Sequence, residues 1–468
     1  MTIATPADHF VRQMWAALNG DEHAVDAVTF TGAGSLLPSV YDVTGFAAAS
    51  VAAASLAVAE FHAARYAQPL RSVSVDRRHA AAAFRSERYL SAQGWELPQI
   101  WDPIAGDYPT RDGWIRLHTN YAYHRDAVVR VLGVAAERKL VAAAVAEWRA
   151  DDLETAVVAA GGCAAMMRSR EGWQTHPQGQ ALRDEPLVSI TTEHAPTPRL
   201  PTADNPLNAA PLDKIRVLDL TRVIAGPVCT RVLAAYGADV LRIDPPGFAE
   251  VQALLGDTTA GKRCAALDLR DPANRATFEH LVTNAHVIVH GYRGDAMRTL
   301  GFTAEHLRTL NPTLLMVSHD AYGWTGPWAA RRGFDSLVQM SCGIAARGRE
   351  VFGSERPHPL PAQALDHGTG YLLAAITCRL LTDLLRTGRV GQARLSLART
   401  ADHLMDQGET GDPTATDFTA DDAAAWLEEA STAFGGIKRV RCPGRIAGIT
   451  AQWIREAGPL GRDAPGWS

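Results

Sequence analysis

A carboxylate at the start of an apolar helix is the residue of this sequence best placed for covalent chemistry. Asp366 precedes two glycines, Gly368 and Gly370, and the pattern predicts a strongly apolar helix over residues 370–385. N–H groups near a helix start can hold a partly desolvated carboxylate ionised, so Asp366 could attack a carbonyl carbon. The two glycines would let backbone N–H groups approach the developing oxyanion. From the residues alone, however, a helix N-cap is the favoured role for Asp366.

Residues 215–247 form the unit that a ligand-binding fold would be built on. Residues 215–220 are an apolar run typical of a buried strand, helical spacing follows from Val228 to Tyr236, and residues 239–244 are a second strand. This unit predicts a parallel sheet whose ligand end lies at the loop after the first strand. The dinucleotide fingerprint G-x-G-x-x-G is absent, which removes the main support for NAD or FAD. An ordinary unit with no ligand remains an alternative.

The bulk composition is that of a soluble globular protein with two or three domains. The chain has 468 residues, of which 47% are hydrophobic and 21% charged. Its net charge of -5 favours neither nucleic acid nor a membrane surface as a partner. The six cysteines include no C-x-x-C pair, so we expect neither a metal site nor a disulfide framework. No signal peptide is recognisable, and the apolar residues 46–61 are too few for a membrane span, so we expect a cytoplasmic location.

Motifs spread over residues 213–400 are more specific than this pattern. They begin with L-D-L-T-R-V-I-A-G-P and L-x-x-Y-G-A-D-V-L-R-I-D-P-P-G inside residues 215–247. Further matching pieces are Gly261-Lys262-Arg263, Leu267-Asp268-Leu269, Tyr292-Arg293, Leu300-Gly301, Asn311-Pro312 and Gly333-Phe334-Asp335. Together they resemble the family III CoA-transferases, also called the carnitine dehydratase family, which include formyl-CoA transferases and α-methylacyl-CoA racemases. The resemblance implies an α/β fold, in which a Rossmann-like parallel sheet domain and a smaller α/β domain are joined by long helices.

The resemblance also divides the chain into segments in an unusual order. Residues 106–192 resemble the small domain of the family through D-G-W-I-R-L, D-L-E-x-A-x-x-A-A-G-G and E-G-W-x-x-H-P-Q-G. Thr419 and Asp422 match a capping box, which predicts a helix over residues 423–434. We expect an N-terminal helical arm (1–105), the small α/β domain (106–192), an extended and exposed proline-containing linker (193–212), the Rossmann-like CoA-binding domain with the Asp366 helix (213–400), and an acidic loop, a helix and a C-terminal return segment (401–468).

An internal repeat relates the N-terminal arm to the Asp366 helix. Residues 45–65 parallel residues 366–386 without a gap, and in both copies the apolar helix leads through a polar turn into a strand. The arm is therefore interpreted as a degenerate copy of the linking helix of the family. Gly45 stands opposite Asp366 and has no carboxylate, so we expect one working site per chain. A shifted alignment that pairs Asp42 with Asp366, and coincidence between two alanine-rich helices, are the alternatives.

The resemblance also bears on assembly. Members of the family form interlocked dimers in which each active site uses both chains, so we expect a homodimer. A fused chain could supply some of those contacts within itself. A mass measurement in solution separates the two hypotheses, because a stable monomer would indicate a self-sufficient chain.

The resemblance changes the preferred role of Asp366 from helix cap to catalytic nucleophile. It implies attack on an acyl-CoA thioester, an acyl-aspartyl anhydride, and an aspartyl-CoA thioester that passes CoA to an acceptor acid. The implied substrates are an acyl-CoA and a small carboxylic acid, with CoA as a substrate, no permanently bound cofactor and no metal. The residues expected to bind CoA, including basic residues for its phosphates, are Arg222, Val223, Ile224, Lys262, Arg263, Tyr292 and Arg293.

Two alternative functions remain open. A racemase or isomerase of the same family needs a second proton-transfer group, and the histidine of its G-H-D motif is replaced here by Phe334, which cannot carry a proton. His367 is a poor substitute, because neighbouring residues on a helix point about 100° apart. A non-catalytic CoA-binding scaffold is suggested by the rearranged domains and by lost family residues. Those positions are Pro245, Gly291 and Thr299.

Overall fold

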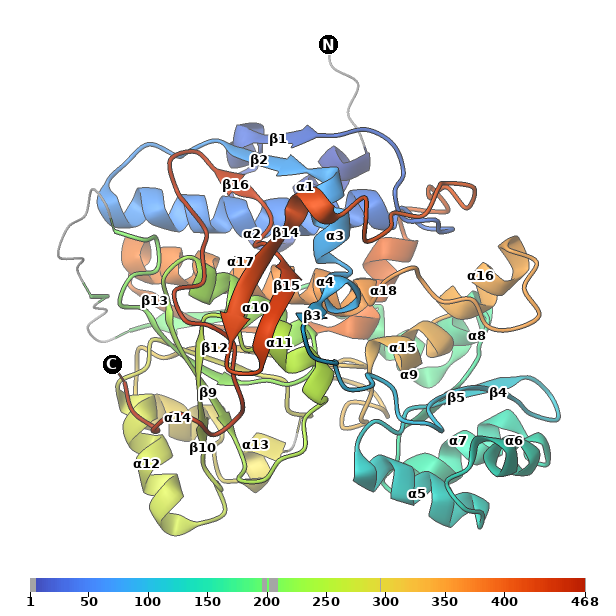
Figure 1. Cartoon of the computed structure of the whole chain (residues 1–468). Helices are drawn as coiled ribbons and strands as arrows, with labels where there is room; N and C mark the ends of the chain where they lie inside the picture. Colours follow the sequence, from blue (N-terminus) through green and yellow to red (C-terminus); the bar gives the residue numbers. More distant parts are fainter. Residues whose placement is uncertain (1–5, 196–199, 202–208, 295, 468) are drawn as a thin grey trace.

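A seven-stranded sheet forms the centre of the protein (Figure 1). The computed structural model describes the chain except for residues 1–5, 196–199, 202–208, 295 and 468. In spatial order the strands are β10 (Lys262–Ala266), β9 (Asp239–Asp244), β8 (Arg216–Leu220), β11 (Val287–His290), β12 (Leu315–Asp320), β13 (Arg389–Ser396) and β7 (Ser189–His194). β7 pairs antiparallel with β13, and the other neighbours pair parallel. The parallel strands follow the 3-2-1-4-5-6 order of the Rossmann fold, so the predicted α/β fold class is confirmed.

Two strands of this sheet differ from the prediction. β10 begins with two basic residues, and its burial depends on acidic partners elsewhere in the sequence. β7 is a polar, half-exposed edge strand without an apolar run. It takes Glu193 and His194 out of the expected linker and into the sheet, where they pair with Val390 and Arg389. Residues 196–199 and 202–208 of that linker lie outside the described residues. At its far end Leu212 is fully buried, so the expected exposure does not hold there.

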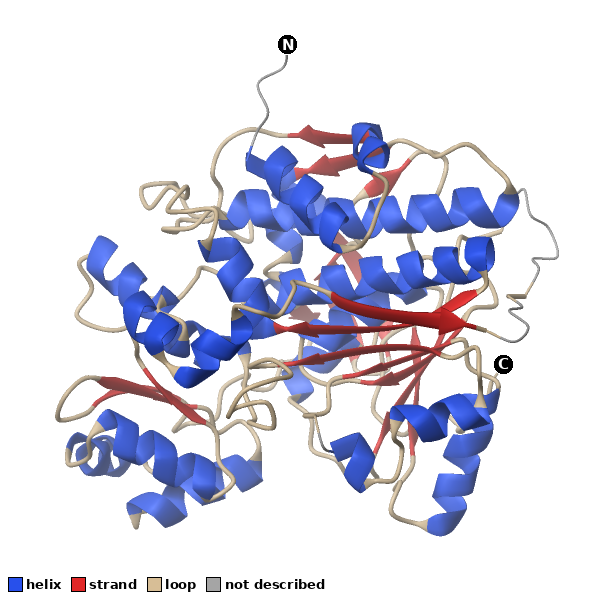
Figure 2. Cartoon of the chain, turned by 180° about the vertical axis from the view of Figure 1, so that it is seen from behind, coloured by secondary structure: helices blue, strands red, loops and turns tan. Residues whose placement is uncertain are grey.

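Helices cover both faces of the sheet (Figure 2). Strand residues alternate between two cores, so that Val217 packs toward the first and Leu218 toward the second. The first core lies under α10 (Ala225–Ala235), α17 (Ala364–Thr387), α2 (Val43–Tyr66) and α1 (Pro6–Ala17), and the second under α12 (Pro272–Thr283), α13 (Ala296–Thr299) and α14 (Ala304–Leu310). α17 packs against both α10 and α2, which makes it the central helix of the fold.

α2 is longer than the sequence pattern indicated. Its 24 residues make it, among the described helices, the one long and apolar enough to cross a membrane by length and composition. Every residue of its most apolar stretch is buried inside the protein. Alanines dominate this helix, and their small side chains allow α17 and α1 to pack closely on it. The apolar composition of α2 is therefore explained by its central position in the core.

The predicted repeat is present in three dimensions. α2 and α17 each have 24 residues and begin at Val43 and Ala364, which is the register of the gap-free alignment. Each is followed by a strand and a helix, namely β2 (Val73–Asp76) and α3 (Arg77–Ala83), or β13 and α18 (Leu397–Met405). β2 pairs parallel with β1 (Val28–Thr31) and antiparallel with β16 (Arg445–Ile446), just as β13 pairs with β12 and β7. Each copy is thus completed by a strand from the other half of the chain.

A smaller sheet lies beside the central one (Figure 1). It contains β4 (Gly106–Pro109), β5 (Trp114–Leu117) and β6 (Ala164–Met166), and packs on α5 (Ala122–Leu132), α6 (Arg138–Ala146) and α7 (Ala150–Ala159). α8 (Arg170–Thr175) and α9 (Pro177–Leu182) lead from it to β7. On the other side of this sheet, α15 (Asp335–Ser341) contacts β5 and β6. The division of the chain into domains at residues 106 and 192 stays a prediction.

The C-terminal region contains the clearest error in the predicted elements. The capping bonds are present, since the Thr419 and Asp422 side chains each accept from the N–H of the other residue. No helix follows over residues 423–434. A short 3-10 turn (Ala424–Trp426) leads instead into β14 (Leu427–Thr432), which pairs with β15 (Gly435–Val440), and β15 also pairs with β3 (Ser91–Gln93). Strand pairing with distant residues therefore outweighs the local helix signal. The expected loop from residue 401 is also shorter, because α18 continues to Met405.

Candidate active site

A cavity of about 300 Å³ lies where the strand order of the central sheet reverses. It lies between the carboxyl ends of β8 and β11, which is where doubly wound sheets bind ligands. Its walls come from the loops after β8, β11 and β12, from the start of α17, and from the small domain. Of the residues predicted to act at the site, this first cavity is lined by Arg222, Val223, Tyr292, Arg293 and Asp366.

Asp366 lies in the first turn of α17 with its side chain largely buried. Gln363 is the N-cap of that helix, so the simple cap interpretation of Asp366 does not hold. The capping role belongs to Asp335 on α15, whose Oδ2 accepts from the N–H of Leu365 at 2.8 Å and of Asp366 at 3.0 Å. The side chain of Asp366 is therefore left to face the cavity.

Neighbouring acids raise the pKa of this carboxyl. Burial raises the pKa of Asp366 well above its usual value of 3.8, and the negative charges of Asp335 and Glu87 raise it further. Burial also raises the pKa of Asp335 to about 6, although its hydrogen bonds oppose the shift. The neutral form of Asp366 is therefore favoured, and a bound cationic or hydrogen-bonding group would favour its ionised form.

Glu87 reaches this site from the first repeat copy. It lies on α4 (Ser86–Tyr89), and its Oε2 is 3.0 Å from Nε2 of the buried His367. Burial alone would raise the pKa of Glu87, but the hydrogen bond and charge of His367 hold that pKa below its ordinary value. His367 is thus occupied as the partner of Glu87. This agrees with the expectation that it does not serve as a second proton-transfer group for Asp366.

A second, smaller cavity of about 100 Å³ lies next to the first. The two share Tyr121, Val223, Phe334 and Asp366 as lining residues. Asp366 therefore stands at the junction of two cavities, one at the carboxyl end of the sheet and one between the two repeat copies and the small domain. Ile224, predicted to contact CoA, lines the second cavity and not the first.

The loop after β8 is held in a strained conformation at this junction. Val223 has a φ of 64°, which is a costly backbone conformation for a β-branched residue. Its N–H points to Glu250 Oε2 at 3.3 Å, and the Tyr121 hydroxyl donates to the other oxygen of Glu250 at 2.7 Å. Arg222 lies over the Phe248 ring at 3.7 Å and near Asp244 at 3.5 Å. The loop is thereby fixed between the large and small domains.

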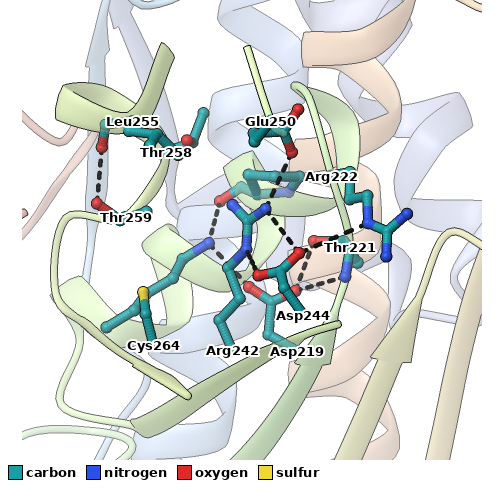
Figure 3. Close-up of polar contacts among 12 residues, drawn as sticks. Asp219, Thr221, Arg222, Arg242, Asp244, Glu250, Leu255, Thr258, Thr259 and Cys264 are labelled. Atoms are coloured by element: carbon teal, nitrogen blue, oxygen red, sulfur yellow. Dashed lines mark hydrogen bonds and ion pairs between the residues drawn. The ribbon is translucent and has the colours of Figure 1, made fainter. Parts of the chain in front are cut away.

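A buried network of charges supports this loop from below (Figure 3). Arg242 joins Asp244 at 2.8 Å and Glu250 at 2.9 Å, and all three side chains are almost fully buried. Asp219 accepts from both the N–H and the hydroxyl of Thr221, the first residue of the loop. Because each charge has a partner, the network orients the loop without leaving an uncompensated charge.

Comparison with known proteins identifies the part of the chain that carries this geometry. The model of the CoA-transferase family III matches residues 212–425, which include the central sheet from β8 onward and the Asp366 helix. This segment belongs to CoA-transferase family III. Residues 1–211 and 426–468 lie outside the match, so the assignment of the N-terminal arm and the small domain to the family stays a prediction.

Named relatives agree with this assignment. The acetyl-coenzyme A transferase nodX of Hypoxylon pulicicidum is 34% identical over 151 residues, which are 31% of this chain and 26% of that protein. The succinate–glutarate CoA-transferase of Agrobacterium fabrum is 33% identical over 197 residues, which are 38% of this chain and 49% of that protein. The chain thus spans less than half of either relative. A crystal structure of Rv3272 from Mycobacterium tuberculosis aligns with a TM-score of 0.39 and 27% identity over 42% of this chain and 58% of that one.

Two basic residues of the family III segment are not in the cavity. Lys262 is fully buried, and its Nζ lies 2.9 Å from Asp219. Arg263 pairs with Asp239 at 2.9 Å and donates to the carbonyl of Gly466. Both lie on β10, and neither lines either cavity. Their expected contact with CoA phosphates is therefore wrong. They stabilise the sheet, because each neutralises an acid on a neighbouring strand.

The two glycines after Asp366 also have a different role. Both lie inside α17, where they are part of the regular helix. A Cβ on Gly368 would come within 2.4 Å of the Phe46 ring on α2, and a Cβ on Gly370 within 2.5 Å of the Ala225 carbonyl on α10. They allow three helices to approach closely. The expected donation of their N–H groups to an oxyanion is therefore incorrect.

Several residues of the site have no counterpart in the sequence prediction. The sequence shows Asp335 only as part of the Gly333-Phe334-Asp335 motif, and its capping of α17 depends on a contact between two helices. Glu87, Tyr121, Arg331 and Arg332 line the cavities from segments remote in sequence. A local pattern could have pointed to Asp335, because the motif places a carboxylate beside an aromatic residue. The others depend on the folding of the chain.

The raised pKa of Asp366 predicts a pH dependence for any reaction in which it attacks. Only the ionised carboxylate is nucleophilic, so we expect kcat/KM to rise with pH along a limb well above the ordinary aspartate pKa of 3.8. Glu87→Gln removes a nearby negative charge and should move this limb to lower pH. Initial rates from about pH 5 to about pH 8 measure both effects. A flat profile for the unmodified protein would contradict the assignment.

Proposed function

We infer that the chain is an acyl-CoA:carboxylate CoA-transferase that works through a covalent intermediate on Asp366. The observation that carries this proposal is the position of Asp366 at the junction of two cavities, within the segment that belongs to family III. A nucleophile that transfers CoA from one acyl group to another must be accessible to CoA from one side and to the carboxylic acid from the other. The two cavities fit those two requirements.

The reaction proceeds by four displacements in which every bond broken is matched by a bond formed. The Asp366 carboxylate attacks the thioester carbonyl and expels CoA thiolate, which leaves an acyl-aspartyl anhydride. The thiolate attacks the aspartyl carbonyl, releases the first acid and leaves an aspartyl-CoA thioester. The acceptor carboxylate then displaces the thiolate to form a new anhydride. Attack of the thiolate on the acceptor carbonyl gives the new acyl-CoA and restores Asp366.

The first cavity is proposed to hold CoA. Arg222, Arg293, Arg331 and Arg332 line it. Guanidinium groups in such an arrangement suit the pyrophosphate and 3′-phosphate of CoA. Val223 lines both cavities, so its fixed backbone would separate the thioester from the acid. Each of these residues binds or positions a substrate, whereas Asp366 alone forms covalent bonds.

The substrates are proposed as an acyl-CoA and a small carboxylic acid. Relatives of this chain include an acetyl-CoA:oxalate CoA-transferase and a succinate–glutarate CoA-transferase, which supports this class. A cytoplasmic location, no nucleic-acid or membrane partner and a homodimer remain predictions. The described chain supplies Glu87 from one repeat copy and Asp366 from the other, so a site with residues from both copies exists within one chain.

Trapping experiments test the proposal against its two alternatives. Incubation with an acyl-CoA followed by hydroxylamine or borohydride should modify Asp366, as located by mass spectrometry of the digested protein. Entry of solvent deuterium at the acyl α-carbon, without exchange of CoA, would instead indicate a racemase. The observation that Phe334 stands in the place of the racemase histidine disfavours this outcome. Bound CoA with neither reaction would indicate a non-catalytic scaffold.

A further inference from the structure

Two residues at the junction of the cavities are bonded to one side chain that lines neither cavity. Tyr121 and Val223 line both cavities, and Glu250 accepts a hydrogen bond from each of them. Tyr121 comes directly before α5 in the small domain, whereas Val223 lies in the loop after β8. Glu250 itself follows β9. One buried carboxylate thus joins two distant parts of the chain beside Asp366.

The carboxylate of Glu250 is held in one orientation by its other partners. Its side chain is almost fully buried, and Arg242 donates to Oε2 at 2.9 Å. The other oxygen, Oε1, accepts from the N–H of Val251 at 2.9 Å as well as from the Tyr121 hydroxyl. A buried carboxylate cannot rotate without losing such bonds, so its two oxygens are fixed. The bonds to the junction therefore start from a rigid group.

The backbone of Val223 needs a rigid partner because it is strained. A β-branched residue with a φ of 64° persists in that conformation only where its surroundings hold it. The N–H of Val223 donates to Glu250 Oε2 at 3.3 Å, and this bond opposes relaxation of the loop. Relaxation would move a side chain that lines both cavities. The bond to Glu250 therefore bears on the shape of both.

We propose that Glu250 is a positioning residue for the transfer reaction, which holds Val223 and Tyr121 so that CoA is bound and water is excluded beside Asp366. The inference rests on the proposed role of Asp366. Water that attacks the aspartyl-CoA thioester forms a carbon–oxygen bond at the carbonyl carbon and breaks the carbon–sulfur bond. The products are the Asp366 carboxyl group and free CoA thiol, so CoA is lost from the transfer. A displaced Val223 would open this route.

Glu250→Gln tests the proposal, because it keeps the size of the side chain but removes its charge and one acceptor oxygen. We expect the Kd for CoA, measured by calorimetry, to rise about tenfold. The amount of free CoA released per CoA transferred should rise at least about fivefold. Glu60→Gln is the matched control, since Glu60 is also buried, pairs with Arg386 at 2.9 Å and lines neither cavity. It should change neither value.

Two further variants show whether Glu250 acts through its bonded partners. Glycine adopts a positive φ without strain, so Glu250→Gln should change both values less in a Val223→Gly chain than in the unmodified chain. Tyr121→Phe keeps every charge, so it tests the proposal even if Glu250→Gln does not fold, and it should shift both values in the same direction. Tyr108→Phe is its control, because the buried Tyr108 hydroxyl donates to the Ile104 carbonyl at 2.8 Å, away from both cavities.

Three results would overturn the inference. They are unchanged CoA binding in a folded Glu250→Gln chain, equal effects of Glu250→Gln with and without Val223→Gly, and CoA binding by Tyr121→Phe that matches that of Tyr108→Phe. If Asp366 forms no adduct with acyl-CoA, the proposed transferase function fails. Calorimetry with CoA still decides the positioning role of Glu250 in that case, because it needs no turnover.

Discussion

Replacing Asp366 with alanine is expected to lower the rate of CoA transfer by a factor on the order of 1,000 or more, and to abolish the trapped adduct. The reason is that the nucleophile is removed while both cavities remain, and loss of a covalent catalyst has effects of at least this size. Rates with saturating acyl-CoA and intact-mass spectrometry after hydroxylamine treatment measure the two results. Asp366→Asn, which keeps the shape of the side chain, should be equally inactive.

The folded state should tolerate this change. Burial disfavours the charged form of Asp366, and the capping of α17 depends on Asp335, so the alanine variant should unfold at a temperature no lower than the unmodified protein. Equilibrium binding of CoA should also persist, because Arg222 and Arg293 remain. Full transferase activity in Asp366→Ala would refute the mechanism. Loss of activity together with loss of folding would fail to support it.

Replacing Lys262 with methionine is expected to reduce the free energy of unfolding by about 3–5 kcal/mol, because it leaves the buried Asp219 charge without its cationic partner. Burial lowers the pKa of Lys262, but the charge of Asp219 counteracts that effect and holds the pair together. Urea denaturation followed by circular dichroism measures the change. Arg270→Met is the matched control, since Arg270 is exposed and its partner Asp268 is partly exposed, and no measurable loss is expected there.

The same variant separates a structural role from the binding role that the sequence suggested. If Lys262 contacted a CoA phosphate, Lys262→Met would weaken CoA binding and leave the stability unchanged. If Lys262 instead acts through its ion pair with Asp219, the free energy of unfolding falls. CoA binding then changes only through the loop that Asp219 holds at Thr221. A variant with normal stability and weak CoA binding would therefore contradict the structure. Arg293 lines the first cavity, so Arg293→Met should weaken CoA binding and leave the stability unchanged.

Elements with a strong pattern of their own could be predicted from the sequence. The apolar strands at residues 215–220 and 239–244 and the long helices α2 and α17 bury whole runs of side chains, so periodicity alone reveals them. The repeat was also predictable, because two helices of the same length, each followed by a turn and a strand, can be aligned without a gap in the sequence. Asp366 was found through the motif that surrounds it.

Features that depend on a distant partner could not be predicted. β10 looks unsuited to a buried strand until Asp219 and Asp239 are placed beside its two basic residues. The segment 423–434 carries a genuine capping box, yet pairing with β15 decides its conformation. The acids and polar atoms around Asp366 come from α4, from the residue after β5 and from α15, whose meeting is a result of the fold. Single residues such as Glu87 and His118 leave no local trace of this.

The exchange of strands between the two halves of the chain has a genetic consequence. In an assembly where each site borrows residues from another chain, two different inactive alleles can rescue one another when expressed together. Here β7 completes the sheet of the second copy and β16 that of the first, and Glu87 meets the Asp366 helix within one chain. Co-expression of a chain disabled in the first repeat copy with one disabled at Asp366 should therefore restore no activity. The activity of each chain is expected to depend only on the residues of that chain.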